Sequence, residues 1–474
     1  GAVLDAQRSK KSLRLLVTAN TYTAVDNVLF EVARDLGALF AGQKPYRVVR
    51  LQGTGRVEPT LLQGQQLVEN LVVTTTEARP DVLALRSELE SPSAQTILVV
   101  GAPNQQLYNL GIATKNKRKL KPPPSPVRNW FDAVVIDEAS QMDVAGSTLV
   151  VTKAAAGASY VLAGDDLQLP PIHAAEPPEG LEALVGSLYS YVRLHHEIEP
   201  DLLQVNYRSN RTLVDFIKTA GYSSALTSFA PDLRLQLLAP LPVTKPLDWP
   251  AEFYWSPDWA SVLDPESSAT CFIYDDDVSS QANPFEVDAV ATLIWLLFGR
   301  LGNNLLGELS PDGLCVLPSG TVADPKHFWT RSVGVVTPHR AQMGKIVARL
   351  QDVFPGHPAH HIRGAVDTVE RFQGQQRDVI IASFGVGDPE LIQAEDEFLF
   401  NLRRFNVLAS RARAKLIVLS PRTLVEHLAD DPRVLEESRL LKRYVEHFCL
   451  PANTITLGYN DGEDRLRHGT LRKR

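Results

Sequence analysis

Short apolar runs alternate with longer stretches of helical periodicity along this chain. Runs typical of strands occur first at Leu13–Thr18, Arg47–Leu51, Thr96–Val100, Ala133–Ile136 and Tyr160–Ala163, and later at Leu202–Val205, Ser332–Thr337, Asp378–Ala382 and Lys415–Leu419. Continuous apolar strands of this length are buried on both faces, as in a parallel sheet covered by helices. The pattern therefore predicts an α/β protein with two parallel sheets, one built from each set of strands.

The two sets of strands also indicate where the chain divides into domains. A break rich in proline precedes a helical stretch near residue 195, so we expect a first domain over residues 1–195 and a second over residues 196–450. Residues 237–268 and 302–329 have few periodic apolar positions and are expected to be irregular insertions. Residues 451–474 are polar and end in basic residues, which predicts a loose tail.

Composition and charge narrow the class of protein. Of the 474 residues, 44% are hydrophobic and 22% are charged, which excludes wholesale disorder and fibrous architectures. The longest apolar run, Ala289–Phe298, is shorter than the ~18 residues that a membrane span needs, so we expect no membrane partner. The net charge of −7 argues against a strongly basic surface that coats nucleic acid, but it allows a narrow basic groove. Cys271, Cys315 and Cys449 show neither zinc spacing nor a disulfide framework, which favours an intracellular location, the cytoplasm.

Two adjacent carboxylates, Asp137 and Glu138, follow an apolar run in the segment AVVIDEASQ. Ligands of open α/β sheets bind at the carboxyl ends of strands. In nucleotide hydrolases, the first acid of such a pair holds Mg²⁺ against the phosphates and the second orients or deprotonates the attacking water. Taken alone, the pair is equally compatible with an acidic helix cap after a strand.

A second segment, GDDLQLPP, follows the next apolar run and starts at Gly164. Alone it would be a turn, the commonest use of Gly, Asp and Pro. Together with DEASQ, however, it resembles motifs II and III of the superfamily 1 helicases, in the branch of the nonsense-mediated-decay RNA helicases and the eukaryotic replication helicase-nuclease. The resemblance implies that Asp137 binds Mg²⁺, that Glu138 activates water and that Gln168 senses the γ-phosphate, with Asp165 also at the nucleotide.

The resemblance continues in the family's order along most of the chain. Further motifs are matched by LQVNYRS (203–209), GVVTPHRAQ (334–342), DTVERFQGQQRD (367–378) and NVLASRAR (406–413). The family pattern implies two RecA-like P-loop NTPase domains with ATP bound between them, and movement in the 5′→3′ direction along single-stranded DNA or RNA.

The later motifs imply roles for residues of the second domain. Arg208 and Arg411 match the arginines that reach ATP phosphate, where positive charge stabilises the transition state. Gly374 would let the backbone approach a phosphate without a Cβ atom in the way. Gln376 stands where the family commonly has the Glu that binds the nucleotide sugar, and an amide can still accept or donate a hydrogen bond there.

The resemblance is less specific for the residues that would contact nucleic acid than for those at the nucleotide. Thr21, in TANTYTAVD, matches the hydroxyl that touches a single strand, and Thr337 and Thr368 are the candidates in the second domain. Tyr22 could stack on a base or pack half-buried on the first helix, and the sequence does not decide between the two. The family usually has Tyr where this chain has His339.

Two other groups of residues are more simply explained as surface loops. His357, His360 and His361 are clustered, but no carboxylate or cysteine completes a metal site, so a surface loop is favoured. The run Lys115–Lys121 is strongly basic, and such runs are more often solvated faces than phosphate grips.

The chain contains no GxxxxGK[ST] segment, the loop whose backbone N–H groups and lysine bind the β- and γ-phosphates. In the family this loop precedes the segment of Thr21, so we expect the first domain to be incomplete at its amino-terminal end and these 474 residues alone to hydrolyse no ATP. The sequence thus predicts an ATP- and Mg²⁺-dependent helicase or translocase when that loop is present. Two alternatives stay open: an ATP-gated clamp or switch with further domains or subunits in a larger assembly, and an ATP-inert nucleic-acid-binding module.

Overall fold

The computed structural model describes residues 2–9, 11–40, 45–53, 71–75, 79–93, 96–112, 128–171, 180–181, 185–372, 374–460 and 464–474. The chain divides into two compact units, Gly1–Pro200 and Asp201–Arg474. The basic run Lys115–Lys121 lies outside the described residues. Within the described residues, every helix is too short or too polar to span a bilayer.

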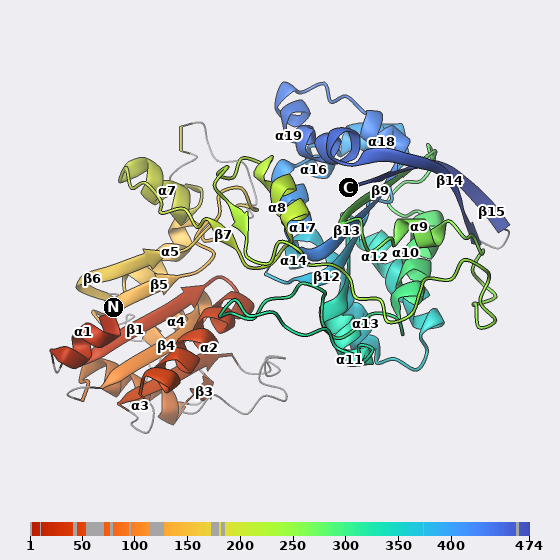
Figure 1. The fold of residues 1–474 in the computed structure, drawn as a ribbon. Helices are drawn as coiled ribbons and strands as arrows, with labels where there is room; N and C mark the ends of the chain where they lie inside the picture. Colours follow the sequence, from red (N-terminus) through yellow and green to blue (C-terminus); the bar gives the residue numbers. More distant parts are fainter. Residues whose placement is uncertain are drawn as a thin grey trace. The chain divides into compact units, whose positions relative to one another are not determined.

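The first unit is built on a sheet with the strand order β3-β2-β4-β1-β5-β6, in which all neighbours are parallel (Figure 1). The strands are β1 (Leu13–Ala19), β2 (Tyr46–Gln52), β3 (Leu71–Thr75), β4 (Ile97–Pro103), β5 (Phe131–Ile136) and β6 (Ala154–Leu162). The helices are α1 (Ala2–Arg8), α2 (Tyr22–Leu39), α3 (Arg79–Glu90), α4 (Asn104–Ile112), α5 (Val144–Val151) and α7 (Leu188–His195).

The central strands of the first unit bury side chains on both faces. Leu16 and Val100 belong to a core with α3, α4, α5 and α7, whereas their neighbours Val17 and Val99 belong to a second core with α1 and α2. Adjacent residues of a strand point to opposite faces, so continuous apolar runs are what a sheet with two covered faces requires. This explains why the apolar runs predicted the central strands.

The second unit has a seven-stranded sheet among its described residues, in the order β11-β10-β12-β13-β9-β15-β14. Its strands are β9 (Ala269–Tyr274), β10 (Val333–Thr337), β11 (Val366–Thr368), β12 (Arg377–Ser383), β13 (Ala412–Pro421), β14 (Leu450–Asn460) and β15 (Asp464–Lys473). The first five in this order are parallel, and β15 and β14 add antiparallel. Two parallel sheets were predicted, and the structure corrects the second to a mixed sheet at one edge.

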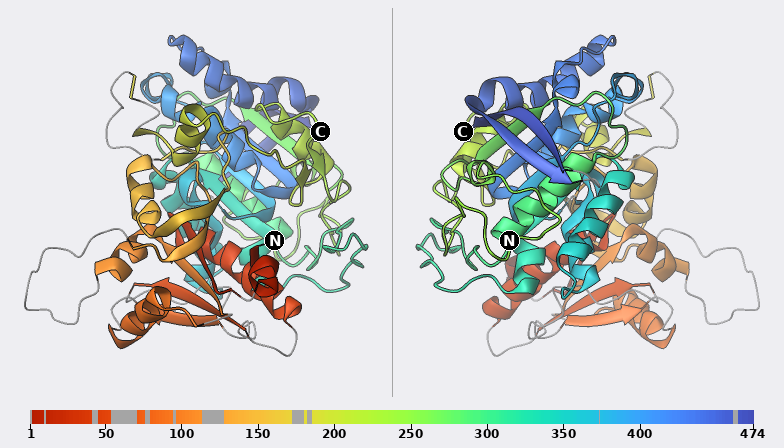
Figure 2. Two further views of the ribbon diagram at one scale, coloured as in Figure 1. Left: turned by 90° about the vertical axis from the view of Figure 1, so that its left-hand side faces the viewer. Right: turned by 90° about the vertical axis from the view of Figure 1, so that its right-hand side faces the viewer.

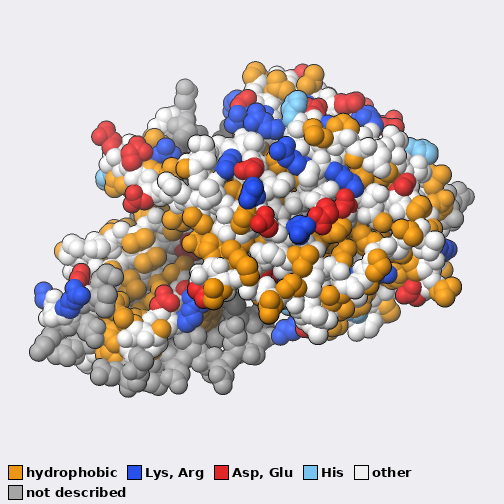
Figure 3. Space-filling model, viewed as in Figure 1, with side chains coloured by type: hydrophobic (Ala, Val, Ile, Leu, Met, Phe, Trp, Pro, Cys, Tyr) orange, Lys and Arg blue, Asp and Glu red, His pale blue; other side chains and the backbone are white. Residues whose placement is uncertain are grey.

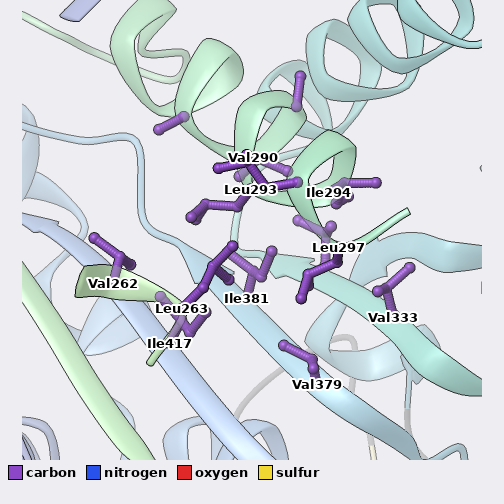
Figure 4. Packing of buried hydrophobic residues seen from close by; sticks show 14 of the residues in the cluster. Val262, Leu263, Val290, Leu293, Ile294, Leu297, Val333, Val379, Ile381 and Ile417 are labelled. Atoms are coloured by element: carbon purple, nitrogen blue, oxygen red, sulfur yellow. The ribbon is translucent and has the colours of Figure 1, made fainter. Parts of the chain in front are cut away.

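Helices cover the sheet of the second unit. They are α8 (Arg211–Lys218), α9 (Trp259–Val262), α10 (Pro284–Leu297), α11 (Pro325–His327), α12 (Arg340–Val353), α13 (Ala359–Ala365), α14 (Val369–Phe372), α15 (Pro389–Ala394), α16 (Asp396–Leu399), α17 (Leu402–Ala409), α18 (Arg422–Glu426) and α19 (Pro432–Lys442), with π-helical turns η1 (Phe328–Ser332) and η2 (Arg443–Phe448). Helix α10 is buried along most of its length, and Leu293 and Leu297 pack over Ile381 and Val379 of β12 (Figure 4).

The expectation of a loose carboxyl-terminal tail is wrong. Residues 450–460 and 464–473 form the antiparallel strands β14 and β15, drawn in dark blue in Figures 1 and 2, and β15 pairs with β9 through Thr470–Ile273 and Leu471–Phe272. Ile455 and Leu457 are buried, with the polar Thr456 between them. Alternation of one apolar and one polar residue is typical of a strand with one solvated face. Because every second residue of such a strand is polar, the segment had the polar composition that suggested a tail.

The expected insertions are also more structured than predicted. Trp249 and Trp259 from the first, and Phe328 and Trp329 at the end of the second, are buried in the main core of this unit. Conversely, the apolar run at residues 202–205 does not join the large sheet. It contributes only the short strand β7 (Val205–Asn206), which pairs with β8 (Thr227–Ser228), and its leucines are exposed.

Candidate nucleotide and nucleic-acid sites

The acid pair lies at the carboxyl end of β5, a central strand of the first sheet. The backbone N–H of Asp137 donates to the carbonyl of Thr18 at 2.9 Å, which continues the pairing of β5 with β1 by one residue. Glu138 has a φ of 51°, a left-handed conformation that is uncommon outside glycine. Backbone strain of this kind concentrates at functional sites.

Partial burial raises the pKa of Asp137 above its ordinary value, and a backbone hydrogen bond opposes this only in part. A bound cation would stabilise the ionised carboxylate. No group of three or more His, Cys, Asp or Glu side chains suited to a metal is found among the described residues. Mg²⁺ is commonly held by one or two carboxylates together with phosphate oxygens and water, so Asp137 fits such an ion.

The second predicted segment lies against the first. The backbone N–H of Asp165 donates to Ser140 Oγ at 3.2 Å, and a Cβ atom on Gly164 would lie 3.0 Å from the backbone nitrogen of Ser140. The glycine therefore permits a close approach between the two segments. Gln168 Nε2 donates to Asp165 Oδ2 at 2.7 Å, so Asp165 orients the amide that was predicted to sense phosphate.

Glu138 also has a partner that the sequence did not single out. Gln141 Nε2 donates to Glu138 Oε2 at 2.6 Å, and Gln141 N donates to the Glu138 carbonyl at 2.9 Å. The motif letters DEASQ contain this glutamine, but its role depends on the turn that the left-handed Glu138 creates.

The nucleic-acid candidates of the first unit differ in exposure. Thr21 is exposed and caps α2, since its hydroxyl accepts from Ala24 N at 3.3 Å. Tyr22 is half-buried: its hydroxyl accepts from Gly53 N at 3.0 Å, and the Arg50 guanidinium lies 5.1 Å from its ring centroid. Of the two interpretations left open for Tyr22, this geometry supports half-buried packing, here against Arg50 of β2 and the following Gly53.

In the second unit, three separate motifs meet at Arg208. Its Nε donates to Gln376 Oε1 at 3.1 Å, and its NH1 donates to the carbonyl of Ser410 at 2.9 Å. Gln376 lies two residues after Gly374, which turns the chain with a φ of 80° before β12. The amide at position 376 therefore serves to hold an arginine that was predicted to meet phosphate.

Two further arginines of this unit have distinct surroundings. Arg411 is only 2% exposed, and its Nε donates to the carbonyl of Val407 near the end of α17 at 3.0 Å. Arg413 forms ion pairs with Asp378 at 2.7 Å and Glu308 at 2.5 Å. Burial raises the pKa of Asp378 to about 6, against the effect of Arg413. Arg413, the second arginine of the segment 406–413, therefore links this segment to Glu308 of the second insertion. The sequence did not reveal this ion pair.

The two threonines predicted to touch nucleic acid from the second unit are neighbours on β10 and β11. Thr337 pairs with Thr368 in the parallel ladder, but Thr337 is fully buried and Thr368 is 7% exposed. The hydroxyl of Thr337 is thus not on the surface. His339, two residues later, is hydrogen-bonded through Nε2 to Glu395 Oε2 at 2.6 Å. On the face drawn in Figure 3, Lys and Arg side chains of this unit are interspersed with acids.

Comparisons with known proteins identify a matching family and several relatives. A family model described as AAA domain (AAA_12) matches residues 184–423. The chain is 22% identical over 465 residues to the DNA replication ATP-dependent helicase/nuclease dna2 of Schizosaccharomyces pombe, covering 96% of this chain and 28% of that protein. It is 25% identical over 439 residues to the DNA replication ATP-dependent helicase/nuclease DNA2 of Mus musculus, covering 89% and 35%. Over 296 residues it is 25% identical to Helicase SEN1 of Saccharomyces cerevisiae, covering 61% and 11%. The chain therefore spans about a third or less of each of these relatives.

Proposed function

Since the chain belongs to the AAA domain family and, within it, to the superfamily 1 branch of the nonsense-mediated-decay and replication helicases, we propose that it is the motor region of an ATP-dependent helicase or translocase. One observation carries the proposal. The acid pair Asp137–Glu138 and the amide of Gln168 come together at the carboxyl edge of a parallel sheet, through the contact of Asp165 with Ser140. An acid pair beside a phosphate-sensing amide is what nucleotide hydrolysis requires at that edge.

In this proposal the first unit holds the metal and handles the proton. Asp137 holds Mg²⁺, which neutralises phosphate charge when it is bound. Glu138, the next residue, orients the attacking water and accepts its proton. Gln168, kept in place by Asp165, meets the γ-phosphate side of the nucleotide.

The second unit contributes positive charge. Arg208 is oriented by Gln376 and Arg411 by the carbonyl of Val407, so each guanidinium is held in place before a nucleotide arrives. Such preorganised charge stabilises a phosphoryl-transfer transition state without further reorganisation. We propose that both arginines and the Gly374 turn act on the same ATP as the acid pair.

The nucleic-acid partner is proposed to be single-stranded DNA or RNA, followed in the 5′→3′ direction. Among the predicted contact residues, Thr21 is the one best placed to reach a phosphate. It is exposed and lies at the amino-terminal end of α2, and helix N-termini bind phosphate oxygens readily. Thr368 is nearly buried and Thr337 wholly so; in the second unit we therefore place more weight on backbone N–H groups near these strands than on the two hydroxyls.

The test is Glu138→Gln, made in a polypeptide that joins a GxxxxGK[ST] loop to the amino-terminal side of this chain, since the 474 residues contain none. We expect nucleotide binding to persist and nucleic-acid-stimulated phosphate release to fall by about 10²–10⁴-fold, the usual contribution of a general base. Glu197→Gln is a matched control, because Glu197 is an exposed glutamate of the same unit with a similar φ of 52°. Near-normal turnover in Glu138→Gln would refute the assignment.

The same protein distinguishes the two alternatives. A clamp or switch within a larger assembly would hydrolyse ATP without displacing a strand from a duplex. An ATP-inert module would bind single strands with an affinity that Mg-ATP does not change. Strand displacement that requires hydrolysable ATP supports the proposal over both.

A further inference from the structure

One guanidinium joins three separate parts of the second unit. Arg413, the second residue of β13, donates through NH1 to Asp378 Oδ1 at 2.7 Å and through NH2 to Glu308 Oε1 at 2.5 Å. Asp378 is the second residue of β12, and Glu308 belongs to the insertion at residues 302–329, where its backbone carbonyl accepts from Val316 N at 2.9 Å. The side chain of Arg413 is 13% exposed and that of Asp378 is 8% exposed. Because the cluster is largely buried, salt screens its ion pairs much less than it screens surface pairs.

The ion pair between Asp378 and Arg413 lies where the pairing of β12 with β13 is irregular. Residues 377 and 379 of β12 lie opposite residues 412 and 415 of β13, so the single residue Asp378 faces two residues of the neighbouring strand. A bulge of this kind locally interrupts the ladder of backbone hydrogen bonds and re-aims side chains, and bulges are frequent next to active sites. At this point, the side chains of Asp378 and Arg413 therefore do much of the work of holding the two strands together.

The bulge lies directly beside Arg411, one of the two arginines proposed to act on ATP. Arg411 is the residue before β13, and its carbonyl accepts from the backbone N–H of Arg377 at 3.0 Å. Arg377 and Asp378 are adjacent in β12, so one backbone contact and one ion pair hold the segment 411–413 against the same two residues. The position of Arg411 relative to β12 therefore depends on the ion pair that seats Arg413.

The charge of Asp378 responds to its neighbours. Burial raises the pKa of Asp378 to about 6, against the effect of the Arg413 guanidinium. Arg331 also lowers this pKa, whereas the carboxylate of Glu308 raises it. Asp378 therefore gains a proton as pH falls through about 6, and the charge of Glu308 moves that point toward neutral pH. The charged and titratable groups around the cluster come from β12, β13, η1, α11 with its cap, and the insertion: Arg377, Arg413, Arg331, His327, Asp324 and Glu308.

We infer that Glu308, Asp378 and Arg413 form a charged triad of positioning residues, through which the insertion at residues 302–329 keeps Arg411 in place for ATP hydrolysis. When Asp378 is ionised, Arg413 is held on β12 and Arg411 keeps its place beside the bulge. When Asp378 takes up a proton, its charge attraction for Arg413 is lost, and Glu308 alone draws the guanidinium toward the insertion. The inference rests on the proposed function, because only there does Arg411 act on ATP.

The first experiment needs no turnover and is made on this chain alone. Hydrogen exchange is followed at the backbone amide of Arg377, which is bonded to the Arg411 carbonyl. Glu308→Gln keeps an oxygen acceptor for Arg413 but removes the charge, and it should increase the exchange rate at Arg377 at least about threefold, the effect of weakening one such bond. Unchanged exchange in this variant would overturn the inference.

The matched control is Glu266→Gln. Glu266 forms an ion pair with Arg234 at 2.6 Å, and Arg234 is bridged to Leu306 of the same insertion. This variant therefore also removes a carboxylate that pairs with an arginine beside the insertion, but its pair includes neither Arg413 nor Asp378. An equal increase of exchange at residue 377 in both variants would overturn the inference, because general loosening of the insertion would then explain it.

The second experiment measures phosphate release between pH 5 and 8 in the polypeptide with the added phosphate-binding loop. Glu308→Gln should lower kcat by about three- to tenfold and change KM by less than about twofold, because it disturbs an arginine that acts in the transition state. The acid limb of its kcat profile should also move to lower pH, since loss of the Glu308 charge lowers the pKa of Asp378. A merely structural defect would lower kcat without moving this limb. Asp378→Asn is uncharged at every pH, so its kcat should be low throughout and lack this limb.

The outcomes separate the triad from the proposed function. If the unsubstituted polypeptide releases no phosphate, the proposed function fails, and the inference fails with it. If phosphate is released and Glu308→Gln matches Glu266→Gln in kcat and in the acid limb, the inference alone is overturned. A raised KM with an unchanged kcat in Glu308→Gln would also overturn it, because residue 308 would then affect substrate binding and not the action of Arg411.

Discussion

The positive charge of Arg411 is unusual, because this side chain is almost fully buried in the second unit. Its Nε bonds the carbonyl of Val407 at 3.0 Å, and its own carbonyl accepts from Arg377 N, also at 3.0 Å. A buried guanidinium is costly unless its donors are satisfied, and a helix carbonyl is a suitable acceptor. The arginine is therefore fixed before any phosphate binds, which suits a role in the transition state more than in capture of the nucleotide.

We predict that Arg411→Ala lowers kcat by about 10²-fold or more while the Kd for nucleotide changes less than tenfold. The measurement is single-turnover phosphate release and equilibrium binding in the polypeptide that carries the phosphate-binding loop. Thermal unfolding of the variant identifies any loss of fold, because the substitution also leaves a cavity. A variant impaired only in nucleotide affinity would contradict the transition-state role.

Among single residues, the sequence could predict those whose proposed role is recognisable from one contiguous motif. Asp137, Gln168 and Arg208 could be named because each stands in a recognisable string. Glu308 could not, since its partner Arg413 lies more than a hundred positions away. Contacts of that kind depend on which strands become neighbours in the sheet, and the local pattern does not contain that information.

Several elements of the second unit are joined by a buried carboxyl group. Glu286 of α10 accepts from the hydroxyls of Tyr274 at 2.6 Å and Ser383 at 2.5 Å and from Gly385 N at 2.9 Å. Burial raises its pKa to about 8, and the nearby Asp276 acts in the same direction. Helix α10, β9 and the end of β12 thus meet at a group that is neutral at pH 7.

We predict that this group gives the second unit a stability that falls as pH rises. The unfolded chain releases the proton near the ordinary pKa of 4.5, whereas the folded unit keeps it up to about pH 8. The contribution is therefore fully present below pH 4.5 and is lost progressively as pH rises through about 8. In Glu286→Gln, the melting temperature should depend less on pH between 5 and 8 than in the unsubstituted protein. Glu252→Gln, at an exposed position, is the control, and parallel curves for all three would refute the assignment.

The hairpin β14–β15 depends on a glycine at its contact with β9. A Cβ atom on Gly469 would collide with the backbone carbonyl oxygen of Ile273 and with the ring of Phe272. We predict that Gly469→Ala destabilises the second unit by about 1–3 kcal/mol through overpacking, measured by denaturant unfolding. Gly344→Ala, in α12 with no atom near the new methyl group, should instead be neutral or stabilising by about 0.5–1 kcal/mol. Equal effects of the two substitutions would mean that β15 is not held as described.

The elements that the sequence predicted and those that it missed differ in physical environment. Central strands such as β1, β4, β12 and β13 are covered on both faces and appear as apolar runs. The strands of the terminal hairpin have one solvated face, so their polar composition suggested a tail. The first insertion was expected to be irregular because its apolar positions lack periodicity, yet tertiary packing buries its Trp259 completely.

Each unit of the whole molecule has its own sheet and its own cores, and the chain carries a net charge of −7. An acidic protein can bind nucleic acid only where local charge and N–H groups face the phosphates. In the described residues, many arginines of the second unit are already paired, as Arg413 is with Asp378 and Glu308 and Arg422 is with Asp275. Cations held in such ion pairs are less available to phosphates, so we expect helix N-termini and backbone groups to carry part of the contact.

The division of phosphate contacts between cations and uncharged N–H groups predicts how the binding of a single strand responds to salt. Each phosphate neutralised by a cation contributes about −0.7 to the slope of log K against log[salt] for single strands, so we expect a slope shallower than about −3. Base sequence should matter little, because contacts to phosphate and sugar carry no sequence information. Fluorescence anisotropy of a labelled oligonucleotide, titrated with this chain over a range of KCl concentrations, gives the slope, and a set of homopolymers tests the sequence dependence. A much steeper slope, or a strong preference for one duplex sequence, would mean that an extended basic surface or a base-reading element binds the nucleic acid instead of the helix starts near Thr21.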